Sequence, residues 1–241
     1  MSEYYTLPSF RLTKERIRRE MKDFKNRLAK LKSEVPDSVT IVAVSKTKPI
    51  SMLEEAYEAG QRVFGENKVQ EVLLKQPQLP DDIEWHMIGH LQTNKVKQVV
   101  PFVSMIHAVD SLKLLNKIQS EAAKIDRVIP CLIQVHIATE ETKFGFDLLE
   151  ADTLFNSISL SEYPNIVFSG LMGMASYVED DDQVKREFGE LKILFDEIKS
   201  GPMSEYGNFK EISIGMTGDY HLAVEKGSTM IRVGTLLFGS R

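Results

Sequence analysis

The sequence predicts an α/β protein with a (β/α)8 TIM barrel, for two reasons. Short apolar segments rich in β-branched residues alternate with segments of helical periodicity along most of the chain. Strict alternation of strands and helices is typical of a parallel sheet with right-handed crossovers. The chain also has 241 residues, close to the ~250 residues that a barrel of eight such units usually needs.

An amphipathic helix is expected ahead of the barrel, over residues 11–33. Its apolar residues recur at spacings of three and four, and charged residues occupy the opposite face. These apolar residues are Leu12, Ile17, Met21, Phe24, Leu28 and Leu31. We expect this helix to pack against the outside of the domain.

Strands and the helices between them account for nearly all of the remaining chain. The expected strands are 40–45, 62–64, 84–88, 104–107, 130–136, 166–171, 211–214 and 230–233. The expected helices are 51–60, 67–75, 93–98, 111–124, 147–158, 183–199 and 219–226. Asp110–Ser111 and Thr217–Asp219 offer side chains that cap helices. Little sequence is left for a second domain, so we expect a single domain over residues 1–241.

The alternative fold is an open, doubly wound parallel sheet. That fold usually carries a glycine fingerprint, G-x-G-x-x-G, after its first strand. Here the first expected strand runs into SKTKPI, residues 45–50, which contains no glycine. The barrel is therefore the better prediction.

Composition excludes several classes of protein. A net charge of −5 does not supply the cationic field that nonspecific nucleic-acid binding requires. Cys131 is the only cysteine, so neither an intrachain disulfide nor a cysteine-based metal site can form. We see no signal peptide and no apolar run near the ~20 residues of a membrane span. We expect a cytoplasmic protein that binds no nucleic acid, membrane or metal.

Lys46 is the first candidate functional residue, because functional groups in a barrel follow the C-terminal ends of its strands. It follows the first expected strand and shares its alternation with Val42 and Val44. If these valines face the interior, the amine emerges at the mouth, where apolar walls would favour the neutral form that imine formation requires. Alternatively, Lys46 simply extends into solvent from the end of a strand.

Two glycine-containing turns follow the seventh and eighth expected strands, where barrels commonly bind phosphate. The first is Gly215–Gly218 and the second is Gly234–Thr235. Glycines let the backbone approach a ligand, and the first amides of the helix that follows point outward. An ordinary turn in which Thr217 caps a helix is the alternative. Arg232 lies in the apolar strand before the second turn, so its guanidinium must be paired or must face a ligand.

A lysine after the first strand and anion-binding turns after the last two suggest a phosphorylated aldehyde, for which pyridoxal 5′-phosphate (PLP) is the obvious candidate. Several further segments span nearly the whole chain in order. They are AVSKTKP (43–49), FGENKVQE (64–71), EWHMIGHLQTNK (84–95), HAVDS (107–111), KFGF (143–146), GLMGMA (170–175), SIGMTGD (213–219) and GSTMIRVGTLLFGSR (227–241). In these segments the sequence resembles the pyridoxal phosphate homeostasis protein family, single-domain relatives of the alanine racemase N-terminal barrel.

The resemblance implies a role for each matching position. Lys46 is implied to be the Schiff-base lysine, Asn67 to lie beside the cofactor and Arg232 to face its pyridine nitrogen. The phosphate is implied to bind the two turns, at Ser213, Gly215, Met216, Thr217, Gly234 and Thr235. The family usually has serine at position 217, and threonine keeps the hydroxyl group.

One family motif is matched without any indication of what its residues do. Its members are His86, Gln92, Asn94 and Lys95. Lys143, just past the fifth expected strand, is either a second amine near the mouth or an ordinary surface lysine.

The resemblance further implies a protein that holds PLP as a Schiff base and acts in intracellular vitamin B6 homeostasis, with little or no catalysis. A cation at Arg232 would disfavour protonation of the pyridine nitrogen and weaken the ring as an electron sink. The racemase relatives add a second base, a tyrosine from another domain, which this sequence lacks. PLP-dependent apoenzymes are implied as recipients of the cofactor, and a monomer is expected.

Two other functions remain open. A PLP-dependent amino-acid racemase would need a substitute base, for which Tyr177 and Tyr220 are candidates because both follow segments at the mouth. A lysine-imine aldolase acting on a sugar phosphate would need acid and base carboxylates, for which only Glu66 and Glu140 are candidates. Racemisation that is lost when either tyrosine is replaced by phenylalanine would favour the racemase. Failure to bind PLP, together with turnover of a sugar phosphate, would favour the aldolase.

Overall fold

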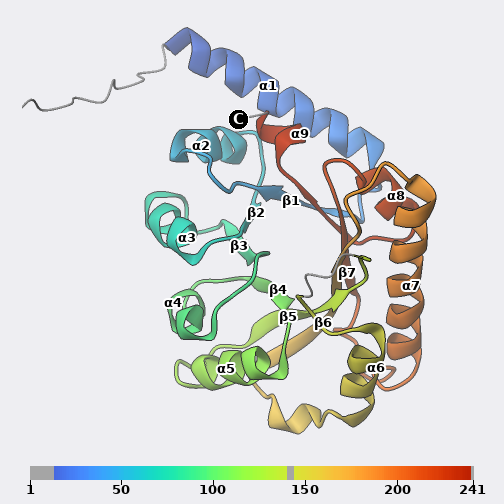
Figure 1. Cartoon of the computed structure of the whole chain (residues 1–241). Coiled ribbons are helices and arrows are strands. Elements are labelled where there is room, and N and C mark those ends of the chain that lie inside the picture. Colours follow the sequence, from blue (N-terminus) through green and yellow to red (C-terminus); the bar gives the residue numbers. More distant parts are fainter. Residues whose placement is uncertain (1–13, 140–143, 240–241) are drawn as a thin grey trace, which may run out of the picture.

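A closed barrel of eight parallel strands in sequence order forms the centre of the molecule (Figure 1). The computed structural model describes residues 14–139 and 144–239, with side chains from residue 23 onward. The strands are β1 (Thr40–Val44), β2 (Val63–Glu66), β3 (Glu84–Met87), β4 (Met105–Val109), β5 (Ile129–His136), β6 (Ile166–Met174), β7 (Glu211–Met216) and β8 (Met230–Val233). β1 pairs with β8, which closes the barrel and contradicts the open sheet.

Helices cover the outside of the barrel and connect its strands (Figure 1). They are α1 (Lys14–Glu34), α2 (Ile50–Glu58), α3 (Val69–Lys75), α4 (Val96–Val99), α5 (Leu112–Ala123), α6 (Leu148–Ser157), α7 (Asp181–Ser200), α8 (Tyr220–Glu225) and α9 (Thr235–Phe238). The described residues also form three short 3-10 helices: η1 (Gln76–Gln78), η2 (Thr93–Lys95) and η3 (Leu160–Glu162).

The predicted fold class and the order of the strands are confirmed, with differences in detail. β2, β4, β6 and β7 extend beyond their predicted ends, so Gly215 and Met216 of the first predicted turn lie in β7. The helix expected over 93–98 is η2 followed by α4. α9 was not predicted, because four residues are too few to show helical periodicity. Ser111 caps α5 as expected by accepting the N–H of Leu114, whereas Asp219 makes no side-chain cap on α8.

The helix α1 packs on the outside of the barrel, as predicted from its apolar face. Phe24, Leu28 and Leu31 are buried, and the ring of Phe24 lies 5.0 Å from that of Phe238 in α9. Residues 11–13 of the predicted helix lie outside the described residues. Figure 1 shows that the beginning of α1 extends past the barrel.

The barrel separates two environments. Most buried apolar side chains form one cluster between the sheet and the helices. A smaller, separate cluster consists of Ala108, Leu132 and Met172. Polar residues also occupy the interior, because His107 of β4 lies in hydrogen-bond contact with Ser213 of β7, and these strands are not neighbours in the barrel. Their side chains must therefore point inward and meet across it.

Two further expectations concern the surroundings of the chain. Within the described ranges, no helix combines the length and apolarity that crossing a membrane would take. Cys131 is a free, fully buried thiol in β5, and burial raises the pKa of that thiol. A buried thiol that stays protonated is a poor nucleophile and a poor metal ligand.

Candidate functional site

Lys46 lies just beyond the C-terminal end of β1, at the mouth of the barrel. On the same face of β1, Val42 is fully buried and pairs in register with Arg232 of β8. Alternation along β1 therefore directs Lys46 to the interior side. Its side chain is exposed, however, so the expected apolar walls around the amine are not what the structure shows. The reason is that β1 ends at Val44, which leaves Lys46 beyond the packed layers of the interior.

Arg232 is buried inside the barrel, with 4% of its surface exposed. Its Nη1 donates to the carbonyl oxygen and to the Oγ of Ser213, each at 2.7 Å, and its Nη2 donates to the carbonyl oxygen of Gly173 at 2.9 Å. Burial lowers the pKa of Arg232 to about 10, partly opposed by Asp219. Arg232 therefore places a positive charge below the mouth at neutral pH.

A chain of hydrogen bonds crosses the interior from Arg232. Ser213 Oγ, which accepts from Arg232, lies 3.0 Å from His107 Nδ1, and His107 Nε2 lies 2.9 Å from His86 Nδ1. Both contacts are hydrogen bonds between neutral rings if Ser213 Oγ donates to His107 Nδ1 and His107 Nε2 donates to His86 Nδ1. Sequence reasoning missed His107 and left His86 without a role. It also put Ser213 in the turn, whereas its fully buried hydroxyl is already bonded inside the barrel.

Burial keeps the two histidines of this hydrogen-bonded row, His86 and His107, neutral near pH 7. It lowers the pKa of His86 to about 4, and burial, then His86 and Arg232, lower the pKa of His107. In the unfolded chain the pKa of both histidines should be ~6.5, so the unfolded state binds more protons than the folded state in mild acid. The stabilisation that comes from burying the histidines in their neutral form is therefore complete above pH ~6.5. It is lost as the pH falls from there toward the pKa values of the folded state.

We expect the free energy of unfolding to fall by ~2 kcal/mol or more between pH 7.5 and pH 5.0, since each unit of pKa difference corresponds to ~1.4 kcal/mol. Urea unfolding at the two pH values measures the change. Replacing His86 with glutamine should reduce this dependence, whereas replacing the exposed His221 with asparagine should leave it unchanged. Equal stability of the wild type at both pH values would contradict neutral burial of the pair.

The two predicted turns lie side by side at the mouth, because Thr217 Oγ1 accepts the N–H of Gly234 at 3.3 Å. The carboxylate of Asp219 accepts the N–H of Met216 and fixes the first turn. Gly215 has a φ of 92°, and a Cβ there would lie 2.5 Å from a side-chain carbon of α8. The second turn leads into α9, whose first amide, that of Thr235, has no partner within the helix. The amides of Met216 and Gly234 are therefore bonded within the turns, and the amide of Thr235 is the group offered to an anion.

Asn67 follows β2, and its Oδ1 is shielded from solvent without a hydrogen-bond partner among the described residues. It borders a cavity of about 560 Å³ formed by the segments after β2 and β3. The other lining residues are Lys68, Val69, Gln70, His90, Gln92 and Lys95. Gln92 and Lys95 of the unexplained motif thus lie near Asn67. An unpaired acceptor beside a cavity is available to a ligand that carries a donor.

Glu66 is the last residue of β2, but its side chain is buried on the outer face of the strand, which does not favour it as an acid or base carboxylate at the mouth. Gly65 faces the interior, where a Cβ would come within 2.9 Å of the side chain of Val42, and the next residue must face outward. Glu66 Oε1 accepts from Ser45 Oγ and from Lys75 Nζ, each at 2.6 Å. The other carboxylate candidate, Glu140, lies outside the described residues, and so does Lys143, which was considered as a second amine.

The surroundings of Tyr177 and Tyr220 do not favour either tyrosine as a substitute catalytic base. The Tyr220 hydroxyl donates to Glu34 of α1, and this bond, together with burial, raises the pKa of Tyr220 to about 12. Tyr177 follows β6 and is 98% exposed. Neither observation favours racemase chemistry.

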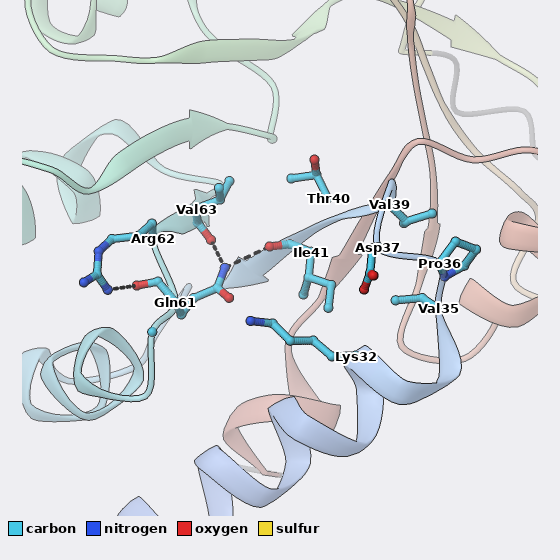
Figure 2. A pocket seen from close by; sticks show the side chains of 11 residues that line it. Lys32, Val35, Pro36, Asp37, Val39, Thr40, Ile41, Gln61, Arg62 and Val63 are labelled. Atoms are coloured by element: carbon cyan, nitrogen blue, oxygen red, sulfur yellow. Dashed lines mark hydrogen bonds between the residues drawn. The ribbon is translucent and has the colours of Figure 1, made fainter.

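A second cavity, of about 330 Å³, lies where β1 and β2 begin, at the opposite end of the strands from Lys46 (Figure 2). Two of its polar side chains, those of Gln61 and Arg62, already have partners. Gln61 Nε2 donates to the carbonyl oxygens of Ile41 and Val63, and Arg62 pairs with Asp82 at 2.9 Å. Since this end of a barrel usually serves stability, we assign the cavity no function.

Known proteins match this chain over most of its length. Residues 20–241 match the family described as the N-terminal domain of alanine racemase. The pyridoxal phosphate homeostasis protein of Aquifex aeolicus is 41% identical over 203 residues, which are 83% of this chain and 86% of that protein. The protein of the same name from Homo sapiens is 37% identical over 210 residues, 83% of this chain and 76% of that protein.

Solved structures agree. PipY of Synechococcus elongatus PCC7942 with PLP bound matches with a TM-score of 0.80 at 35% identity, over 90% of this chain and 100% of that chain. Alanine racemase from E. faecalis, at 12% identity and a TM-score of 0.69 over 93% of this chain and 58% of that chain, shares the fold alone. The chain therefore belongs to the pyridoxal phosphate homeostasis protein family, whose barrel is of the alanine racemase N-terminal type.

Proposed function

We propose that this chain binds PLP through Lys46 and acts in PLP homeostasis, with little or no catalysis of its own. One observation carries the proposal: an exposed amine follows β1 on the interior side of the barrel, and β8, which pairs with β1, carries the buried Arg232 and leads into a glycine turn. The names of the relatives, and the PLP bound to PipY, support the same reading.

The residues fit PLP group by group. Lys46 supplies the amine, the two turns supply the amide of Thr235 and the hydroxyl of Thr217 for the phosphate, and Asn67 supplies its Oδ1. Bound PLP supplies an aldehyde that condenses with an amine and releases water. Arg232 faces the pyridine nitrogen in this proposal, and Ser213 acts indirectly by orienting Arg232.

Several features favour storage and transfer over turnover. The exposure of Lys46 lets water and other amines reach the bound aldehyde, which suits exchange better than a closed site does. The charge of Arg232 disfavours a protonated pyridine and so weakens carbanion chemistry. We propose PLP-dependent apoenzymes as recipients, a monomer as the working form and the cytoplasm as the compartment, the last in keeping with Cys131 as a free thiol.

A visible-absorption titration of the purified chain with PLP tests this function. We expect a yellow band that saturates at one PLP per chain and is lost in Lys46→Ala. The matched control is Lys113→Ala, which removes an exposed lysine of α5 and should leave the titration unchanged. A band of equal strength in Lys46→Ala would contradict the proposal.

A further inference from the structure

A buried charge cluster lies directly beneath the loop that carries Lys46. It consists of Glu66 of β2 with Glu71 and Lys75 of α3, and we call it the Lys75 cluster. Lys75 Nζ lies 2.6 Å from Glu66 Oε1 and 3.1 Å from Glu71 Oε2. Lys75 is 4% exposed and Glu66 is fully buried. A lysine so deeply buried is rare unless it is paired.

The cluster binds the backbone on both sides of Lys46. Lys75 Nζ donates to the carbonyl oxygen of Ser45 at 2.8 Å, and the N–H of Thr47 donates to Glu71 Oε2 at 2.6 Å. The hydroxyl of Ser45 is also held, by Glu66. Both peptide groups that flank the Cα of Lys46 are therefore anchored, and rotation of either one would break a charge-assisted bond.

The backbone just after Lys46 is strained. Thr47 has a φ of 63°, in the left-handed region that a β-branched residue rarely adopts. Such a conformation persists only where the surroundings enforce it, and it is often found at functional positions. The bond from Thr47 N–H to Glu71 supplies that enforcement here.

The polar groups that bond to Ser45 and Thr47 are committed to this geometry, whereas the buried Glu66 Oε2 has no hydrogen-bond partner among the described residues. The three protons of Lys75 are all used, on Ser45, Glu66 and Glu71. Burial by itself would raise the pKa of Glu71, but the bonds from Thr47 and Lys75 lower it on balance. Glu71 is thus a carboxylate at neutral pH, and its oxygens only accept. Apolar side chains would fill the same volume without the desolvation penalty of buried ions.

We propose that the Lys75 cluster is a positioning device, which fixes the backbone around Lys46 so that its amine points at the aldehyde of the bound cofactor. The proposal rests on the proposed function, because it assigns a task to residues that serve that same amine. Lys75, Glu66 and Glu71 are positioning residues, since they act through Ser45 and Thr47 and not on the ligand.

Glu71→Ala is the most direct test, because Glu71 is only part-buried and its loss leaves the Lys75–Glu66 pair in place. Without PLP, we expect faster hydrogen exchange at the amides of residues 45–48. With PLP, we expect the dissociation constant to rise about tenfold. We also expect borohydride reduction to trap PLP on Lys46 more slowly. Glu71→Gln should restore most of the exchange protection and most of the PLP affinity, since its amide oxygen can still accept the N–H of Thr47.

The control is Glu54→Ala, which removes an exposed carboxylate of the neighbouring helix α2 and should match the wild type. If exchange and PLP binding in Glu71→Ala equal those of the wild type while the wild type is modified at Lys46, the positioning role is wrong and the proposed function stands. If exchange rises in Glu71→Ala but PLP does not attach to Lys46 in the wild type, the proposed function fails and this inference falls with it.

Discussion

Replacing Lys75 with methionine is expected to lower the free energy of unfolding by ~3–5 kcal/mol, the usual result of breaking a buried ion pair from one side. Glu66 would keep its carboxylate in a fully buried position with only Ser45 as a partner. Urea unfolding at pH 7.5 measures the loss. A change below ~1 kcal/mol would mean that the pair is not buried as described.

The pH dependence of this variant identifies the cause. Burial already raises the pKa of Glu66, against the opposing bonds from Lys75 and Ser45, and loss of Lys75 removes the larger opposition. A raised folded pKa stabilises at low pH and destabilises as the pH rises through it. The deficit relative to wild type should therefore be smaller at pH 5.5 than at pH 8. Adding Glu66→Gln should restore much of the stability, because it removes the stranded charge.

Gly170→Ala is expected to prevent folding or to cost more than ~4 kcal/mol. Gly170 lies in β6 with a φ of 148°, and a Cβ there would be 1.7 Å from the carbonyl oxygen of Glu211 in β7. The obstacle is backbone, so the pairing of β6 with β7 must open to admit it. Recovery of soluble protein and its urea midpoint are the measurements.

Gly189→Ala is the matched control for the preceding substitution. Gly189 lies inside α7, and a Cβ there would meet nothing within 4 Å. Alanine has the higher helix propensity, so this variant should gain ~0.5–1 kcal/mol. A Gly170→Ala protein as stable as the wild type would show that β6 and β7 do not approach as closely as described.

The fold was predictable because its signals are local. Each strand and each longer helix shows its own periodicity within a short stretch of sequence, and their alternation along the chain predicts the barrel. In a barrel, functional residues follow the C-terminal ends of the strands. This rule made Lys46 and the turns near Gly215 and Gly234 candidates for the site. α9 was missed because its four residues carry no periodic signal.

The supports of the site were not predictable, since they depend on contacts between distant strands. His107 sits in a segment that predicts a strand, but the sequence does not tell that it meets Ser213 across the barrel. Glu71 and Lys75 show the spacing of an ordinary surface ion pair on a helix. Only the fold brings β1 over them and buries Lys75. Glu66 was misplaced for the same reason, because its outward side of β2 depends on the register of the barrel.

Borohydride reduction of the PLP-saturated chain, followed by peptide mapping, tests the central claim most directly. We expect one stable adduct, on the peptide that contains Lys46, formed in proportion to the visible band. Adducts spread over exposed lysines such as Lys113, or an adduct at a single other lysine, would contradict the assignment of the amine at the end of β1.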